Sequence, residues 1–239
     1  MLVACRAYRQ GFHVRLNRFY FLFPAAAALL AGCQSAPPKP VVRRAVVTVE
    51  PPGKADAWLG VATAEDAERV HRLDNAWQAA LADARSAGFR REVAAESELL
   101  RPTAALPMPA PTPGSYECRL VRLGRYTRKT RAYERFKPFF CYVEVADGQL
   151  TVVKQTGSQR PAGRLWEDDA PTRMIFLGSV ALGEEEQPLA YGENQGRDMA
   201  GVLERVAPFR WRLVVPWPRG QSKLDVFELT PVAEQPKPA

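Results

Sequence analysis

Apolar residues fall at every second position through most of the chain after Ser115, and this alternation constrains the fold more than any other feature. Neighbouring side chains of a β-strand point to opposite faces of a sheet, so a period of two predicts strands with one buried face. Trp211, Leu213 and Val215 follow this rule. The pattern predicts strands at 115–123, 139–146, 149–155, 172–182, 199–206, 209–215 and 223–229.

The connections between these strands favour one antiparallel domain over 115–230. Asp147-Gly148 separates two of the strands and is typical of a tight hairpin turn. Seven or eight short strands joined in sequence predict a small antiparallel β-barrel, with a β-sandwich as the alternative.

The segment 56–101 has a helical pattern instead. Apolar residues recur at spacings of three and four from Trp58 to Ala87, which predicts one helix with one apolar face. Thr63, followed three residues later by Asp66, is a capping signal, and Gly88 is a typical helix stop. The fold class is therefore α+β, with the helical part before the barrel.

A second, weaker helical stretch runs through Val93, Leu99 and Leu100 and has to end near Pro102. Five prolines between 102 and 114 then predict a stiff linker before the barrel domain. At the other end of the chain, 231–239 reads as a disordered tail.

Residues 1–32 have the organisation of a secretion signal. Four arginines and no acidic residue precede the apolar stretch 19–30, and Leu-Ala-Gly-Cys follows at 30–33. This ending resembles the lipobox of bacterial lipoproteins, which implies acylation of the Cys33 sulfur, cleavage before it and a further acyl chain on the new amino terminus. Twelve apolar residues are too few to span a bilayer, which argues against a signal anchor.

The residues around Cys33 suggest a destination. Gln34 follows the cysteine, where Asp would retain such a lipoprotein in the inner membrane, so by this analogy we expect an outer-membrane lipoprotein facing the periplasm. The segment 33–55 then serves as a lipidated, Pro-rich tether. Translation starts at Met1 or near Val14.

The high isoelectric point belongs partly to the leader. Losing its four arginines takes the net charge from +7 to +3. We therefore expect no nucleic-acid partner.

Two cysteines remain for the barrel once Cys5 leaves with the leader and Cys33 carries lipid. Cys118 and Cys141 lie in two predicted strands, and in an oxidising compartment they predict a disulfide that contributes about 3 kcal/mol. A redox-active or metal-binding pair is the alternative, but there is no Cys-x-x-Cys and no neighbouring histidine. We expect no metal site and no cofactor.

A basic segment between two predicted strands is the clearest candidate for a binding surface. Residues 119–137 carry eight basic side chains and one acidic one. They predict a loop that docks on anionic lipid or on an acidic envelope protein, with a solvated connection as the alternative. The residues assigned to it are Arg119, Arg122, Arg125, Arg128, Lys129 and Arg131.

Two further segments carry polar loop chemistry. The stretch 156–164 predicts a loop in which Ser158, Arg160 and Arg164 cradle an anion, although turn chemistry alone also explains it. The acidic stretch 183–198 lacks the spacing of a calcium loop, so we expect a solvated loop at the barrel rim.

Three stretches together resemble a known family: GSYECR at 114–119, TGSQRPAGRL at 156–165 and MAGVLERVAPFRWRLVVPWP at 199–218. They are similar to an uncharacterised domain-of-unknown-function family of secreted alphaproteobacterial proteins, over about 58–231. The resemblance implies that the helices and the barrel form one unit and carries no activity. The architecture also resembles calycin-type barrels, which include periplasmic protease inhibitors and lipid carriers, but fold alone does not give function.

The sequence gives no support for nucleophilic catalysis and singles out no pair of carboxylates for glycosidic cleavage, so an enzyme ranks third. It has no Gly-x-Ser-x-Gly, and the chain after the leader keeps a single histidine, His71. We expect a monomeric, non-catalytic envelope lipoprotein that binds or scaffolds through its basic loop. The alternatives are a carrier of a small apolar ligand or lipid in the barrel, and a calycin-like inhibitor.

Overall fold

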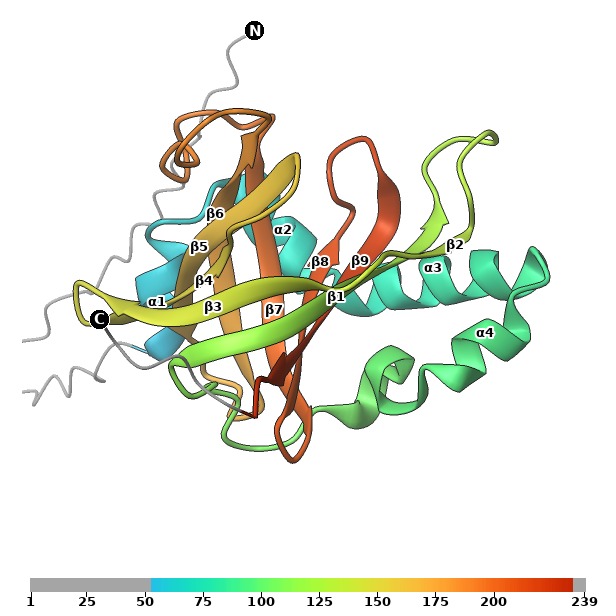
Figure 1. Ribbon diagram of the computed structural model, residues 1–239, viewed down its shortest axis with the longest axis horizontal. Helices are drawn as coiled ribbons and strands as arrows, with labels where there is room; N and C mark the ends of the chain where they lie inside the picture. The colour runs from blue at the N-terminus through green and yellow to red at the C-terminus, as the bar shows by residue number, and fades with distance from the viewer. Residues whose placement is uncertain (1–52, 234–239) are drawn as a thin grey trace, which may run out of the picture. The chain divides into compact units, whose positions relative to one another are not determined.

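The computed structural model describes residues 53–233 (Figure 1). The predicted signal peptide, Cys33, nearly all of the tether and most of the predicted tail lie outside the described residues. Within that range the helices are α1 (Lys54–Leu59), α2 (Ala64–His71), α3 (Leu73–Ser86) and α4 (Arg90–Ala95), followed by the short 3₁₀ helices η1 (Ser97–Leu100) and η2 (Pro102–Ala104).

The strands of the same range begin at Gly114. They are β1 (Gly114–Arg125), β2 (Tyr133–Arg135), β3 (Phe139–Ala146), β4 (Gln149–Lys154), β5 (Gln159–Glu167), β6 (Arg173–Leu182), β7 (Asp198–Ala207), β8 (Arg210–Pro216) and β9 (Ser222–Pro231).

Eight of these strands close into an antiparallel barrel, which confirms the barrel and excludes the sandwich. Strands β3 to β8 each pair with the next strand along the chain, and β3 also pairs with β1. The first strand, β1, closes the barrel against β9, in a register that runs from Tyr116 opposite Pro231 to Arg125 opposite Ser222. The short strand β2 pairs with the second half of β1 and lies outside the closed ring.

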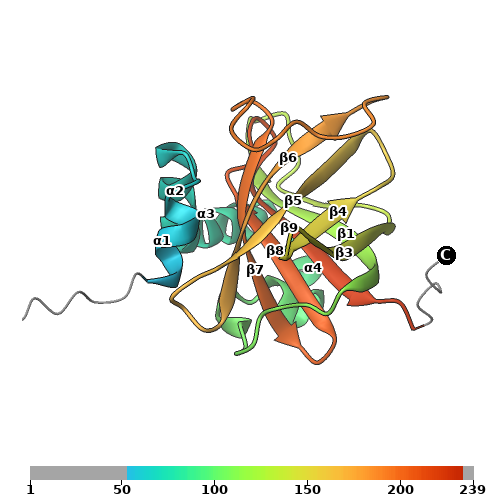
Figure 2. The ribbon, with the colours of Figure 1, turned by 90° about the vertical axis from the view of Figure 1, so that its left-hand side faces the viewer.

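The alternation of side chains produces two apolar cores. One fills the barrel, where Phe176, Leu203 and Trp211 are buried. The other lies between the outer barrel wall and the helices, where Trp77 packs with outward-facing residues such as Val214. Figure 2 shows α1, α2 and α3 together on one side of the barrel. Because the second core needs both parts, the helices and the barrel form one unit.

The single helix predicted from Trp58 to Ala87 is wrong: the segment forms α1, α2 and α3. Thr63 caps α2, since its side-chain oxygen accepts the Asp66 N–H at 3.2 Å, so the capping signal is confirmed. The same residue has an extended backbone, with ψ at 151°, and a helix cannot continue through it. Apolar spacing alone could not reveal the break, because α2 and α3 both turn their apolar faces to the barrel.

The predicted helix stop at Gly88 is confirmed. Its φ of +98° lies in the left-handed region that favours glycine. The N–H of Gly88 donates to the Arg85 carbonyl at 3.3 Å, and that of Phe89 to the Ala84 carbonyl at 3.1 Å. This pair of bonds is a Schellman ending of α3.

The loop predicted at 156–164 is wrong beyond Ser158, because β5 begins at Gln159. Pro161 and two glycines suggested turns. However, Pro161 lies one residue beyond the ladder between β4 and β5. Its partner on β6 is Val180, whose N–H donates to the carbonyl of Arg197 and not to β5. Pro161 and Val180 therefore exchange no backbone hydrogen bond, and the missing N–H of the proline costs none.

Gly163 of this strand lies directly opposite Gly178 of β6, and the two strands approach closely there. A Cβ at Gly163 would lie 2.5 Å from the Leu177 carbonyl oxygen. Glycine is thus required by strand packing and does not mark a turn.

The predicted linker 102–114 is attached to one end of the barrel. The N–H of Leu106 donates to the Arg205 carbonyl at 2.8 Å. The Trp211 indole N–H donates to the Pro109 carbonyl at 2.9 Å, and the Tyr116 hydroxyl to the Thr112 carbonyl at 2.6 Å. The segment therefore belongs to the barrel. Among residues 53–233, no helix combines the length and the apolar character that crossing a membrane requires.

Candidate functional site

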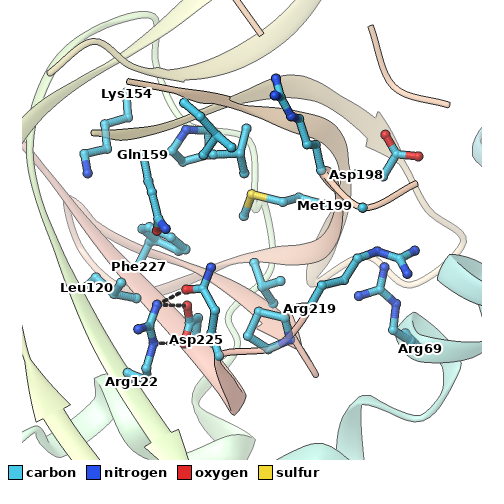
Figure 3. Close-up of a pocket in the computed structure, with 18 residues that line it drawn as sticks. Arg69, Leu120, Arg122, Lys154, Gln159, Asp198, Met199, Arg219, Asp225 and Phe227 are labelled. Carbon is cyan, nitrogen blue, oxygen red and sulfur yellow. Dashed lines mark hydrogen bonds and ion pairs between the residues drawn. The ribbon is translucent and has the colours of Figure 1, made fainter. Parts of the chain in front are cut away.

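A cavity of about 220 Å³ lies inside the barrel at one end, which we call the barrel mouth (Figure 3). Strands β1, β4, β5, β6, β7, β8 and β9 all contribute to its wall, together with α2 and the loop before β9. Its apolar floor includes Leu120, Met199, Val215 and Phe227, and its cationic residues are Arg69, Arg122, Lys154, Arg197 and Arg219.

Below the mouth the barrel is almost full. A second cavity of only about 20 Å³ lies between the disulfide, Phe176 and Leu213. Deeper still, the Tyr116 and Trp211 rings meet edge to face, with centroids 6.0 Å apart. The space available to a ligand therefore lies at the mouth.

The predicted disulfide between Cys118 and Cys141 is present, with 6.0 Å between the two Cα atoms. The two cysteines are diagonal neighbours on β1 and β3, because Cys118 lies opposite Phe139 and Cys141 lies opposite Tyr116. Both side chains are buried in the barrel interior. The bridge is therefore part of the barrel core.

Two of the cations at the mouth are paired with carboxylates. Arg122 donates to Asp225 from Nε at 3.0 Å and from Nη2 at 3.1 Å, and also bonds Gln221. Arg197 donates to both carboxylate oxygens of Glu185, at 2.6 and 2.7 Å. These pairs hold both side chains in the wall of the mouth.

Lys154 on β4 differs from them. Its ammonium has no hydrogen-bond or ion-pair partner among residues 53–233 and lies 4.3 Å from the centroid of the Phe139 ring. Burial, and then the charge of Arg160, lower the pKa of the Lys154 ammonium. It lines both the mouth and the small cavity below it.

Arg69 on α2 belongs to a buried polar cluster at the opposite wall. The fully buried Asp66 carboxylate accepts from the Arg69 guanidinium and, at 2.7 Å, from the Tyr191 hydroxyl. Arg69 also donates to the Trp217 carbonyl at 3.1 Å. Burial, and then the charge of Arg219, lower the pKa of the Arg69 guanidinium.

Arg219 completes this cluster from the loop between β8 and β9. Its Nη1 donates to Glu65 at 3.1 Å, while its Nη2 is 3.8 Å from Asp66. Several buried polar atoms here have no hydrogen-bond partner within the described chain: Nε of Arg69, Nε and Nη2 of Arg219, and Oδ2 of Asp198. Buried polar groups are usually hydrogen-bonded, so these atoms can accept water or a ligand as a partner.

The six residues of the predicted basic loop do not share one surface. Arg119 donates to Glu96 and Glu228 on the outer wall of the barrel. Arg122 faces the mouth, and Arg125 donates its backbone N–H to Asp83 at 2.7 Å and its side chain to the same carboxylate. The three that remain exposed, without an ion pair to any described residue, are Arg128, Lys129 and Arg131.

The three residues assigned to the anion loop also have separate surroundings. Arg160 donates to the carbonyls of Gly157 and Gly183, at 2.8 and 2.6 Å. Arg164 donates to Asp147 at 2.7 Å, and Ser158 lies in the turn before β5. The geometry does not gather them into one cradle.

Histidine and metal chemistry receive no support within residues 53–233. His71 packs its ring against Trp58, with centroids 5.8 Å apart. No group of three or more histidine, cysteine, aspartate or glutamate side chains in that range could hold a metal ion.

The sequence reasoning missed Lys154, Arg69 and Arg219. A signal existed for Lys154, because the period of two that turns Val152 inward also turns Lys154 inward. Arg69 and Arg219 carried no such signal, since each is close to the other only through the folded barrel.

A family model described as "Domain of unknown function (DUF4893)" matches residues 58–229. No curated protein and no solved structure matches the chain. The matched range begins near the end of α1 and ends in β9, so it contains α2 to α4, nearly all of the barrel and the mouth. The chain therefore belongs to the DUF4893 family of domains of unknown function.

Proposed function

We propose that this protein is a non-catalytic binding protein that holds a small amphipathic anion in the mouth of its barrel. One observation carries the proposal: the mouth combines an apolar floor with Lys154, a half-buried cation that has no carboxylate partner among the described residues. Burying a charge without a partner is costly, and a bound anion offsets that cost.

The size of the mouth limits the ligand. An apolar cavity of about 150 Å³ holds benzene, so about 220 Å³ suits a ligand of roughly ten non-hydrogen atoms. Since the barrel is nearly full below the mouth, a long acyl chain has no place to enter. A small molecule therefore fits better than a lipid.

Native mass spectrometry of the protein extracted gently from its own membranes tests this proposal. We expect an additional mass of about 150 Da that is released on activation, from a ligand of the size estimated above. The Val180→Phe variant, which fills the mouth from β6, should lack that mass, while the exposed-site control Lys129→Gln should keep it. A wild-type protein that carries no small molecule would count against the proposal.

A second candidate function is docking on an anionic surface through the loop between β1 and β2. Arg128, Lys129 and Arg131 are exposed there without ion pairs to described residues, and Tyr126 beside them is 60% exposed. Each such cation near an anionic membrane contributes about 1 kcal/mol. We expect sedimentation with anionic phospholipid vesicles at low salt, and its loss when all three residues are changed to Ser.

The proposed setting of both functions is the periplasmic face of an outer membrane, with the chain held by acyl groups on Cys33. The sequence around Cys33 supports this setting, and so does a disulfide, which persists in an oxidising compartment. Metabolic labelling with a fatty acid tests it: the wild-type chain should be labelled, and the Cys33→Ala chain should not.

A further inference from the structure

Two opposite walls of the mouth carry cationic side chains that can still donate hydrogen bonds to a ligand. Lys154 is on β4, whereas Arg219 lies between β8 and β9 and Arg69 lies on α2 behind them. Around the ring of eight strands, β4 and β8 are four strands apart in either direction, so they face each other across the barrel. Figure 3 shows Lys154 on one side of the cavity, and Arg219 and Arg69 on the other.

The capacity on the Arg219 side comprises nitrogens of two guanidiniums, and the unpartnered Oδ2 of Asp198 lines the same cavity. Nε and Nη2 form one edge of the Arg219 guanidinium, and both atoms are buried without a hydrogen-bond partner among the described residues. This edge is the one that takes two parallel hydrogen bonds from a carboxylate. Nε of Arg69, whose residue is only 9% exposed, is unpartnered beside it.

The other cations at the mouth have no buried side-chain nitrogen that lacks a hydrogen-bond partner among the described residues. Arg122 is held by Asp225, and Arg197 is held by both oxygens of Glu185. Lys154 and the pair Arg219 and Arg69 are therefore the cations with capacity for a ligand. Between them lie the apolar side chains of Met199, Val215 and Phe227.

We propose, resting on the proposed function, that the ligand is a small diacid: one carboxylate binds Lys154, the other binds Arg219 and Arg69, and a short apolar spacer lies on the floor of the mouth. A ligand with a single acidic group satisfies one wall and leaves the other unpartnered. The same cavity therefore prefers diacids to monoacids of equal length.

Isothermal titration of the purified full chain with two matched series tests the proposal. The diacids are glutarate, adipate and pimelate, and the monoacids are pentanoate, hexanoate and heptanoate, all at one ionic strength and pH 7. We expect the best diacid to bind at least about 10-fold more tightly than its monoacid, which is the usual gain from one hydrogen-bonded charge.

The variants decide which residues create the preference. Lys154→Gln should weaken the binding of both series, because it removes the cation that takes the carboxylate of either ligand, and Arg219→Gln should weaken the diacids by at least about 10-fold, so each variant should remove the preference for the diacid. The matched control Lys129→Gln removes one positive charge from the exposed loop and should change neither series. Circular dichroism of each variant checks that it folds.

The outcomes separate the two proposals. Equal affinity for diacids and monoacids, or a diacid preference that survives Arg219→Gln, overturns the diacid inference and leaves a monoanion-binding mouth. No binding of either series at millimolar concentration overturns both proposals. A diacid preference lost in both mouth variants and kept in Lys129→Gln supports both.

Discussion

The guanidinium of Arg212 lies over the indole ring of Trp77, 4.9 Å from its centroid, and so joins β8 of the barrel to α3. Arg212 is completely buried. Its Nε donates to Glu204 at 2.7 Å, and its Nη atoms donate to carbonyls at the end of the helical segment, including those of Leu99 at 3.0 Å and Pro102 at 3.0 Å. One side chain thus terminates the helical segment and holds it on the barrel.

Replacing Arg212 with Met should lower the free energy of unfolding by about 3–5 kcal/mol, because Glu204 and several carbonyls would lose their buried partner. Arg212→Lys should recover little of this, since an ammonium cannot reproduce the fork of the guanidinium. Urea unfolding followed by tryptophan fluorescence measures both. A loss below about 1 kcal/mol for Arg212→Met would show that the helices are held by apolar packing alone.

Glu96 predicts a specific dependence of stability on acid. Burial alone would raise the pKa of the Glu96 carboxyl, but hydrogen bonds and charge from Arg119 and the bond from the Tyr133 hydroxyl hold that pKa below its ordinary value. Since the pKa is lower in the folded state, Glu96 stabilises the fold above its unfolded pKa of about 4.3. This contribution is lost as the pH falls through the folded pKa.

The variant Glu96→Gln should therefore be less stable at pH 7 and lose less stability than the wild type between pH 7 and acid. The exposed Glu92→Gln, on the same helix region, controls for the loss of one carboxylate. Urea unfolding at a series of pH values gives the two slopes. Parallel slopes for wild type and Glu96→Gln would contradict the assignment.

The contact between Glu96 and Tyr133 also predicts how the Tyr133 hydroxyl ionises at high pH. Burial, followed by its hydrogen bond to Glu96, raises the pKa of the Tyr133 hydroxyl to about 12. We therefore expect Tyr133 to ionise later than an exposed tyrosine in a spectrophotometric titration. The Tyr133→Phe variant should lack this late step, and the exposed-site control Tyr126→Phe should retain it.

The disulfide should stabilise the barrel by lowering the conformational entropy of the unfolded chain. The bond joins residues separated by 23 positions, which corresponds to about 3 kcal/mol in the chain-entropy treatment. The double variant with Cys118→Ala and Cys141→Ala should lose about that amount in urea unfolding. Its stability should also become independent of added dithiothreitol, whereas an unchanged free energy of unfolding would refute a structural role.

Gly163→Ala should destabilise the contact between β5 and β6. A Cβ there would meet the Leu177 carbonyl oxygen at 2.5 Å and the Gly178 Cα at 2.6 Å, and both atoms belong to backbone that has little freedom to move. We expect a loss of about 1–3 kcal/mol, as in other overpacked sites. The exposed Gly196→Ala meets only the Asn194 side chain and serves as the control in the same thermal unfolding experiment.

Much of the fold could be predicted because local signals and tertiary packing agree. The period of two, the Asp147-Gly148 turn and the Thr63 cap all recur in the structure, with φ of +51° at Asp147 and +77° at Gly148. The signals failed where tertiary packing overrides local preference. Pro161 and Gly163, taken alone, indicate a loop. They form a strand because Val180 and Gly178 of β6 lie opposite them and tolerate a proline and a close approach of the two backbones.

The candidate site could be predicted less well than the fold. The positions of charged residues along the chain do not show which way their side chains point. Arg119, Arg122 and Arg125 are three residues apart and look like one basic surface. In a strand such a spacing reverses the direction of the side chain, so Arg122 points into the barrel while the other two point outward to Glu96 and Asp83. The period of two, applied to charged as well as apolar residues, would have separated them.

The pairing of β1 with β9 also sets the order in which the molecule can be assembled. Val121 lies opposite Val226, so the seam joins segments from the two ends of the barrel sequence. Such non-local pairing requires closure of the long intervening chain, which costs conformational entropy and slows folding. The ion pair of Arg122 and Asp225 crosses this seam at the mouth. The cavity at the mouth is consequently complete only when β9 is in place, since Asp225 and Phe227 of that strand form part of its wall.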